Sequence, residues 1–171
     1  LYSVGTILGL FLDPQFRAVL NLSRFTRRVA RLTKGFYIVC GFGSTGSMLA
    51  HALLLRDYGV VVLEREQDII HGMALSDQIS HVPALAADVS DRRMLELAGL
   101  YKQNCLGVMA ITNEDHANLT IAITSKLLRP ELPVMARSET PRVTANMASF
   151  DTNHMVDPYS IFAQRLYLAL C

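Results

Sequence analysis

The residues with the clearest chemical potential are three glycines that follow a short apolar run. Gly41, Gly43 and Gly46 form a G-x-G-x-x-G pattern directly after residues 36–40 (FYIVC), where a helical pattern begins. In this setting the first glycine permits a tight turn, the second lets the backbone approach a pyrophosphate, and the third lets helix and strand pack closely. The amides at the start of the helix form an anion site. The predicted nucleotide-binding loop comprises Gly41, Phe42, Gly43, Ser44, Thr45 and Gly46.

Two acidic residues follow later apolar runs. Glu64 lies 18 residues after Gly46, where a carboxylate can accept hydrogen bonds from ribose hydroxyls and repel a 2′-phosphate, so NADP is disfavoured. A solvated strand end is the plain alternative for Glu64. Asp88 ends the third predicted strand and is expected at the same crevice, on the adenine or ribose side of the ligand. Capping of a helix that begins near Asp91 is its equal alternative.

The elements that must position these residues alternate between strand-like and helix-like segments from Phe36 onward. This alternation predicts an α/β fold, a Rossmann-like, doubly wound parallel sheet of six strands with helices on both faces. Parallel strands end at one edge of the sheet, which would bring the glycines and the acids together. The predicted strands are 36–40, 60–64, 81–88, 106–112, 132–138 and 154–157, and the predicted helices are 44–58, 66–75, 91–98, 114–129, 141–149 and one that begins near Pro158.

Charge divides the chain into a basic arm at 1–35 and a domain at 36–171. The arm carries six basic residues against one acidic residue, and the domain has an acidic excess, within a net charge of +1. Arg24, Arg27 and Arg28 share one helical side with Arg31, opposite an apolar side. This helix is a solvated face packed on the domain or a juxtamembrane helix that faces anionic headgroups. No nucleic-acid reader motif accompanies it, so no nucleic-acid partner is predicted.

The two ends of the chain indicate a fragment of a longer polypeptide. Residues 1–12 are apolar, but as a helix they would reach only about 18 Å, less than the roughly 30 Å hydrocarbon layer. The first residue is not methionine, and the chain stops inside an apolar run. Three cysteines lie far apart without a CxxC pair, which argues against a disulfide framework or a zinc site, and no metal is predicted.

Several blocks of sequence, in order, carry a family resemblance. Residues 36–170 resemble the N-terminal lobe of RCK domains, the regulators of potassium conductance also called KTN domains. The matching blocks are YIVCGFGSTG, VVVLERE, AADVSDRRMLELAGL, VMAITNEDHANLTIAITSKLLRPELPVMARSE and HMVDP. The resemblance implies a lobe that binds NAD(H) or an adenine nucleotide (AMP, ADP or ATP) and gates the pore of a membrane potassium channel or transporter. It also implies a place at the cytoplasmic face of the cell membrane and a homodimer or higher ring, with the helix near Pro158 crossing to a neighbouring subunit.

The resemblance also assigns site residues. It makes the three glycines the phosphate loop, Glu64 the ribose-binding acid and Asp88 part of the adenine side. Further candidates for binding are Arg65, Val89, Thr112, Asn118 and Arg137, with Asp115 near the crevice. Asn118 has the alternative of bonding only a neighbouring loop, and Arg137 that of a structural ion pair or a contact to a partner subunit. The chain departs from many members at Ser44, where they carry a basic residue, and at residues 86–88, where Ala-Ala-Asp replaces Gly-Asp-Ala.

An enzyme is the weaker expectation. The five histidines show no paired spacing, and His116 is the only acid–base candidate beside the predicted crevice, with a surface histidine as its plain interpretation. We therefore expect a sensor without catalytic residues. An NAD-dependent oxidoreductase domain and a nucleotide-free assembly scaffold are the alternatives.

Overall fold

Six parallel strands form the single sheet of the computed structural model, which describes residues 13–140, 142–143, 145–146 and 154–156. The strand order is β3-β2-β1-β4-β5-β6, so the chain winds outward in both directions from β1. This arrangement confirms the predicted Rossmann-like class. The strands are β1 Phe36–Cys40, β2 Gly59–Glu64, β3 Ala84–Ala86, β4 Cys105–Ala110, β5 Val134–Arg137 and β6 His154–Val156.

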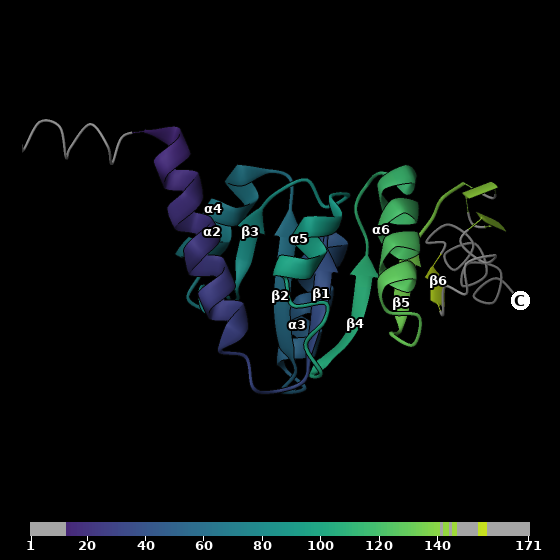
Figure 1. Cartoon of the computed structure of the whole chain (residues 1–171), viewed down its shortest axis with the longest axis horizontal. Coiled ribbons are helices and arrows are strands. Elements are labelled where there is room, and N and C mark those ends of the chain that lie inside the picture. Colours follow the sequence, from purple (N-terminus) through teal and green to yellow (C-terminus); the bar gives the residue numbers. More distant parts are fainter. Residues whose placement is uncertain (1–12, 141, 144, 147–153, 157–171) are drawn as a thin grey trace, which may run out of the picture.

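Helices cover both faces of the sheet, as Figure 1 shows, with α5 and α6 in front and α3 behind. The described helices are α2 Pro14–Ala30, α3 Ser44–Leu54, α4 Gln67–Leu75, α5 Arg92–Leu97 and α6 Asp115–Leu128. Successive side chains of a strand point to opposite faces. In β1, Ile38 accordingly packs in the core beneath α2, α5 and α6, and Val39 packs in the core beneath α3 and α4. Both faces of β1 are therefore buried, which explains its unbroken apolar run.

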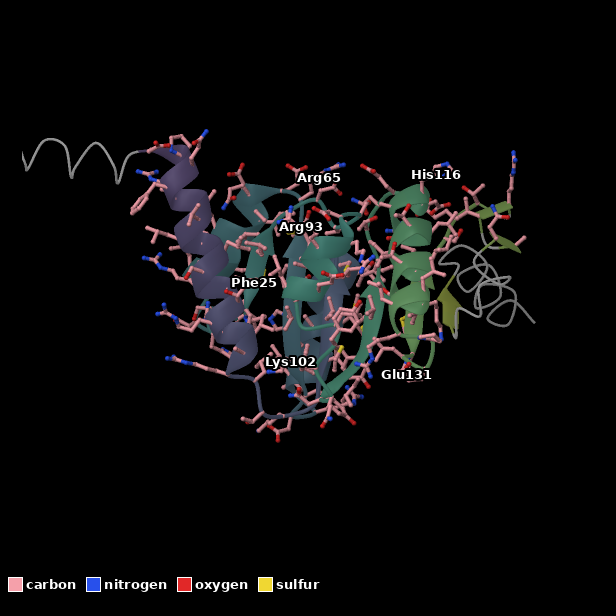
Figure 2. The ribbon with its side chains drawn as sticks, viewed as in Figure 1. Phe25, Arg65, Arg93, Lys102, His116 and Glu131 are labelled. Carbon is pink, nitrogen blue, oxygen red and sulfur yellow. The ribbon has the colours of Figure 1, made fainter. Side chains whose placement is uncertain are left out.

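The basic helix α2 packs on the domain. Asp13 caps its start by accepting a hydrogen bond from the Gln15 amide, with Pro14 in the first turn. Phe25 is 2% exposed within the core on that face of the sheet. At the other end, Lys102 donates to the carbonyls of Val29, Ala30 and Leu32, which joins the end of α2 to the loop before β4 (Figure 2). The arginines of α2 are exposed, while its apolar side packs on the domain, as expected for a helix with one solvated face. The juxtamembrane role stays a prediction.

Two predicted elements are wrong in extent. The helix predicted at 44–58 ends at Leu54, because residues 55–58 turn and Asp57 takes a left-handed conformation (φ 65°). Gly59 is the first residue of β2, one residue before the predicted strand start, and a Cβ there would lie 2.8 Å from that of Phe36. The strand predicted at 81–88 shrinks to three residues, because residues 76–82 form turns and Pro83 precedes the ladder.

Other predictions keep their place or fall outside the description. Gly99 takes the left-handed conformation expected after α5, with φ 90°. Of the helix predicted at 141–149, residues 142–143 and 145–146 are helical. Residues 1–12 and the helix predicted from Pro158 lie outside the described residues. Among the residues that are described, no helix is both long enough and apolar enough to cross a membrane.

Candidate functional site

A crevice of about 170 Å³ opens at the carboxyl ends of the strands, above β1. Turns after β1, β2, β3 and β4 all contribute to it, as expected where the direction of winding reverses. Of the predicted site residues, seven line the crevice: Gly41, Gly43, Glu64, Arg65, Asp88, Val89 and Thr112. The other lining residues are Glu66, Ile69, Ser90, Ile111, Asn113, Glu114 and Ala117.

The three glycines of the loop have three different surroundings. Gly41 has φ 98°, a conformation that side chains disfavour. A Cβ on Gly46 would lie 2.1 Å from the carbonyl oxygen of Gly41, so α3 can approach β1 only without it. A Cβ on Gly43 would meet no atom within 4 Å. The fold therefore accounts for the first and third glycines, whereas the space at Gly43 is left open toward the crevice.

Glu64 joins the glycine loop to the end of β2. Its Oε2 accepts a hydrogen bond from the Phe42 amide at 2.6 Å, and its Oε1 accepts one from the Glu66 amide at 3.0 Å. The side chain is 9% exposed, at the wall of the crevice, and is not the solvated strand end of the alternative interpretation. A carboxylate offers about four acceptor positions, so two remain for a ligand hydroxyl.

The other residues of the predicted loop do not line the crevice. The Phe42 side chain is 7% exposed and packs in the core beneath α3, so only its backbone serves the loop. Ser44 and Thr45 are exposed in the first turn of α3. Gly43 is the N-cap of α3. It has no side chain that could accept a hydrogen bond from the first amides of the helix. These amides can still serve an anion.

Asp88 and its neighbours form the side of the crevice next to the carboxyl end of β3. Asp88 is exposed, and its Oδ1 accepts a hydrogen bond from the Ser90 amide at 2.9 Å. The cap of α5 is instead Asp91, which accepts from the Arg93 amide, so the capping alternative for Asp88 is wrong. Val89 is buried at 5% exposed. Asp88 therefore keeps acceptor positions open toward the crevice, and its contact with a ligand stays a prediction.

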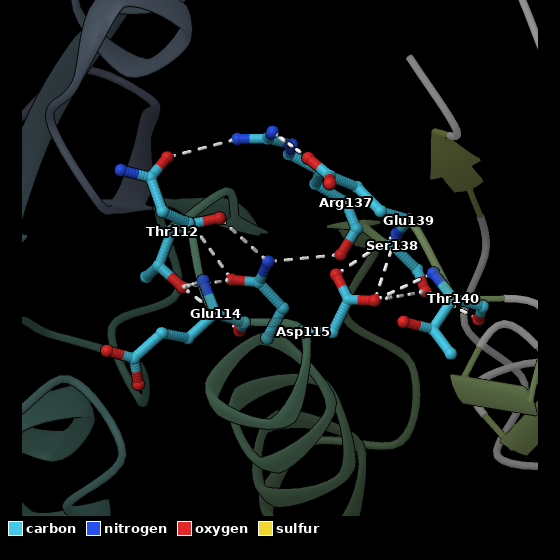
Figure 3. Close-up of polar contacts among 9 residues, drawn as sticks. Thr112, Glu114, Asp115, Arg137, Ser138, Glu139 and Thr140 are labelled. Atoms are coloured by element: carbon cyan, nitrogen blue, oxygen red, sulfur yellow. Dashed lines mark hydrogen bonds and ion pairs between the residues drawn. The ribbon is translucent and has the colours of Figure 1, made fainter. Parts of the chain in front are cut away.

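Asn118 and Thr112 form a closed network behind the crevice (Figure 3). Asn118 is fully buried, its Oδ1 accepts from the amide and the hydroxyl of Thr112, and its Nδ2 donates to the carbonyls of Thr112 and Arg137. It thereby joins the ends of β4 and β5. Its hydrogen bonds are those of the alternative interpretation, in which Asn118 holds a neighbouring loop.

Asp115 and Arg137 extend this network away from the crevice. Partial burial works to raise the pKa of Asp115, but hydrogen bonds from Thr140, Glu139 and Ser138 outweigh it and hold that pKa below its ordinary value. The guanidinium of Arg137 donates to Asn113 at 3.2 Å and pairs with Glu139 (Figure 3). Arg137 does not line the crevice, so its contacts match the structural ion pair. His116 lies at the start of α6 (Figure 2). It is exposed and does not line the crevice either.

One contact across the crevice was not predicted. Arg65, which follows β2, forms an ion pair with Glu114, which precedes α6, with Nη1 and Oε1 2.8 Å apart. Glu114 lies inside the matched sequence block, but nothing in its local pattern signals a partner 49 positions away. The described residues contain no cluster of three potential metal ligands.

The strand order, the glycine loop and the crevice at the carboxyl ends define a Rossmann-type domain. The family model of the TrkA-N domain matches residues 37–158. The chain therefore belongs to the TrkA-N domain family, which confirms the resemblance to RCK domains.

One relative of this chain is a potassium channel protein. Potassium channel protein 1 of Methanocaldococcus jannaschii is 22% identical over 160 residues, which cover 94% of this chain and 46% of that protein. The chain thus spans about half the length of this relative.

Solved structures share the fold. The TrkA-N domain of the inner membrane protein YbaL from Escherichia coli superimposes with a TM-score of 0.70 at 19% identity, covering 81% of this chain and 98% of that one. GsuK bound to ADP gives 0.64 at 17% identity over 86% of this chain and 37% of its own, and the GsuK channel bound to NAD gives 0.61 at 17% over 74% and 22%. The AMP-bound Kef C-terminal domain of Shewanella denitrificans gives 0.65 at 17% identity, covering 79% of this chain and 80% of that one.

Proposed function

We propose that this domain is a ligand sensor that binds an adenine nucleotide or NAD(H) in the crevice and thereby regulates potassium transport through a membrane channel or transporter. The observation that carries the proposal is the open space at Gly43. Two glycines of the loop are required by close contacts inside the protein, but a Cβ on Gly43 would meet nothing. A glycine at this position is accounted for by a ligand whose phosphates approach the backbone.

Two further features support an adenine ligand. Glu64 is held by two backbone amides and retains acceptor positions for ribose hydroxyls. Asp88 lies on the next turn along the edge with open acceptor positions of its own. Structures of the same fold were solved with ADP, NAD or AMP. Together these observations favour a nucleotide that lies along the strand ends from the loop toward β3.

Calorimetric titration of the chain with NAD, NADH, AMP, ADP and ATP tests binding. The decisive variant is Gly43→Val, which fills the open space while its φ of −68° suits any residue. Gly72→Val is the matched control, because a Cβ on that α4 glycine also meets nothing within 4 Å. We expect Gly43→Val to weaken binding at least about tenfold and Gly72→Val to leave it unchanged. Binding that is equal in both variants, or absent from the folded wild type, contradicts the proposal.

Regulation requires a second measurement on the longer native protein that contains this domain. A ligand shifts a conformational equilibrium only through its different affinities for the two states, commonly about 1–3 kcal/mol. We expect potassium flux through the native protein to change when the bound nucleotide is added, and Gly43→Val to abolish that change while basal flux persists. Such a domain would act at the cytoplasmic face of the cell membrane as a homodimer or higher ring. Flux that ignores a ligand shown to bind refutes the regulatory half of the proposal.

The two alternatives predict different outcomes of the titration. An NAD-dependent oxidoreductase would need a proton donor or acceptor beside the nicotinamide. The described lining of the crevice offers its carboxylates for that role, and no His, Tyr, Lys or Cys. Hydride transfer upon addition of a substrate would favour the enzyme. A folded chain that binds none of the five nucleotides would favour the assembly scaffold.

A further inference from the structure

The charged lining of the crevice is mostly negative. Among the described residues that line it, one carries a positive charge, the guanidinium of Arg65. The four acids of the lining are Glu64, Glu66, Asp88 and Glu114. The glycine loop adds Ser44 where a basic residue would offer a second cation, so the loop attracts anions only through backbone amides and the dipole of α3. A polyphosphate would therefore meet more negative than positive charge.

The single cation is already engaged. Arg65 contacts Glu114 across the crevice at 2.8 Å and also lies 3.6 Å from Glu66. Arg65 and Glu114 come from different turns, one after β2 and one before α6, and both line the same cavity (Figure 2 shows Arg65 at this edge). Because Nη1 of Arg65 faces Glu114 and its Nε faces Glu66, a ligand phosphate must share the guanidinium with these carboxylates.

We infer that the crevice selects adenine ligands of low net negative charge, and that Glu114 enforces this selection by holding Arg65 and by repelling additional phosphates. The inference rests on the proposed function, because it specifies the ligand class of the same crevice. NAD⁺ and AMP belong to the favoured class, and ATP without a divalent cation belongs to the disfavoured one. Glu114 is a specificity-determining residue in this scheme, and Arg65 is the residue that contacts phosphate.

The physical reason is the sum of like charges in a confined space. Every phosphate added to an adenosine ligand raises its repulsion from the four carboxylates, while the attraction of Arg65 is shared with Glu114. Arg65 and Glu114 are 63% and 55% exposed, so solvent screens their pair and the effect on any one ligand is moderate. The effect grows with the charge of the ligand, and that dependence is the signature to measure.

The test is a titration series of adenosine, AMP, ADP and ATP at low salt without divalent cations, with NAD⁺ compared against ADP. The variant Glu114→Gln removes only the charge, and the fold should be kept because this side chain makes no cap to α6. We expect wild-type affinity to fall from AMP to ADP to ATP and to be higher for NAD⁺ than for ADP. Glu114→Gln should raise affinity about threefold for AMP and about tenfold for ATP, and leave adenosine unchanged.

Three further variants separate this selection from a general charge effect. Arg65→Gln should weaken the binding of AMP and leave the binding of adenosine unchanged. When Arg65→Gln and Glu114→Gln are combined, the gain in affinity from Glu114→Gln should be smaller. Glu96→Gln is the matched control, because the Arg92–Glu96 pair has a similar length, 2.7 Å at its closest atoms, but lies on α5, outside the crevice. Raising the salt concentration to about 0.5 M should bring the wild type and Glu114→Gln together.

The outcomes that overturn the inference differ from those that overturn the proposed function. ATP that binds wild type as tightly as AMP does, or a Glu114→Gln series parallel to that of the wild type, refutes charge selection while nucleotide binding stands. A folded wild type that binds none of the ligands refutes both.

Discussion

Two regions at the same edge of the sheet use similar polar side chains in opposite ways. In the crevice above β1 and β2, Glu64 and Asp88 each keep acceptor positions open, and Gly43 borders unfilled space. Behind it, above β4 and β5, both polar atoms of the Asn118 side chain form hydrogen bonds within the protein. Position at the carboxyl edge therefore does not make a residue a ligand contact, and unused bonding capacity is the better criterion.

The same contrast exists inside the glycine loop, and the largest expected effect tests it. Gly46→Ala would place a Cβ 2.1 Å from the Gly41 carbonyl oxygen, so α3 must move away from β1. We expect it to lower the free energy of unfolding by at least about 2 kcal/mol. Gly43→Ala meets no atom and should change that free energy by less than about 0.5 kcal/mol. Urea unfolding of both variants decides, and equal losses would show that the two glycines do not differ.

Asn118→Ala is the next largest change. It leaves the Thr112 amide and the carbonyl of Arg137 without their buried partner, so we expect a loss of about 2 kcal/mol, measured by the same unfolding experiment. Nucleotide affinity, measured on whatever fraction stays folded at low temperature, should change little. Asn113→Ala is the control for stability alone, since Asn113 is exposed and accepts a bond from Arg137 but lines the crevice. If Asn118→Ala leaves stability unchanged, the structural role is wrong and Asn118 is again a candidate for contact with the ligand.

This division explains how much of the site the sequence could predict. The loop at Gly41–Gly46 and Glu64 are adjacent to strands whose apolar runs are unmistakable, so their meeting at one edge follows from the parallel order alone. Whether a polar side chain at that edge is free depends on its partners, and those lie far away in sequence. Asn118 bonds the carbonyl of Arg137, and Arg65 pairs with Glu114. Such contacts leave no periodic pattern to recognise.

The type and order of the helices and strands were easier to predict than the residues at which they begin and end. Buried parallel strands such as β1 and β2 need continuous apolar residues, and that requirement is visible in the sequence. The third strand was predicted at 81–88 but spans Ala84–Ala86, because Val82 is buried in a turn and its apolar character mimics a strand. Likewise residues 55–58 continue a helical pattern, although the chain turns at Asp57.

Arg137→Gln should have a smaller effect on stability, and it tests whether the network above β4 and β5 is separate from the crevice. Its guanidinium pairs with Glu139 and bonds Asn113, so we expect a stability loss of about 1 kcal/mol or less in urea unfolding. Nucleotide affinity in calorimetry should stay within about twofold of the wild type, because Arg137 does not line the crevice. A tenfold loss of affinity without a stability change would instead assign Arg137 to phosphate binding.

The smallest effect is expected from Asp115→Asn, and its signature is a dependence on pH. Hydrogen bonds from Thr140, Glu139 and Ser138 outweigh partial burial and hold the pKa of Asp115 in the folded chain below its ordinary value. A depressed folded pKa adds stability above the unfolded value, and this stability is lost as the pH falls through the folded value. The variant should therefore be less stable than wild type by under about 1 kcal/mol at neutral pH, because solvent screens the group. The two should converge at acidic pH, once the pH has fallen below the folded pKa and wild-type Asp115 is protonated. Urea unfolding between neutral and acidic pH measures the gap, and a gap that stays constant would mean that Asp115 joins the ends of α6 and β5 by shape alone, without its charge.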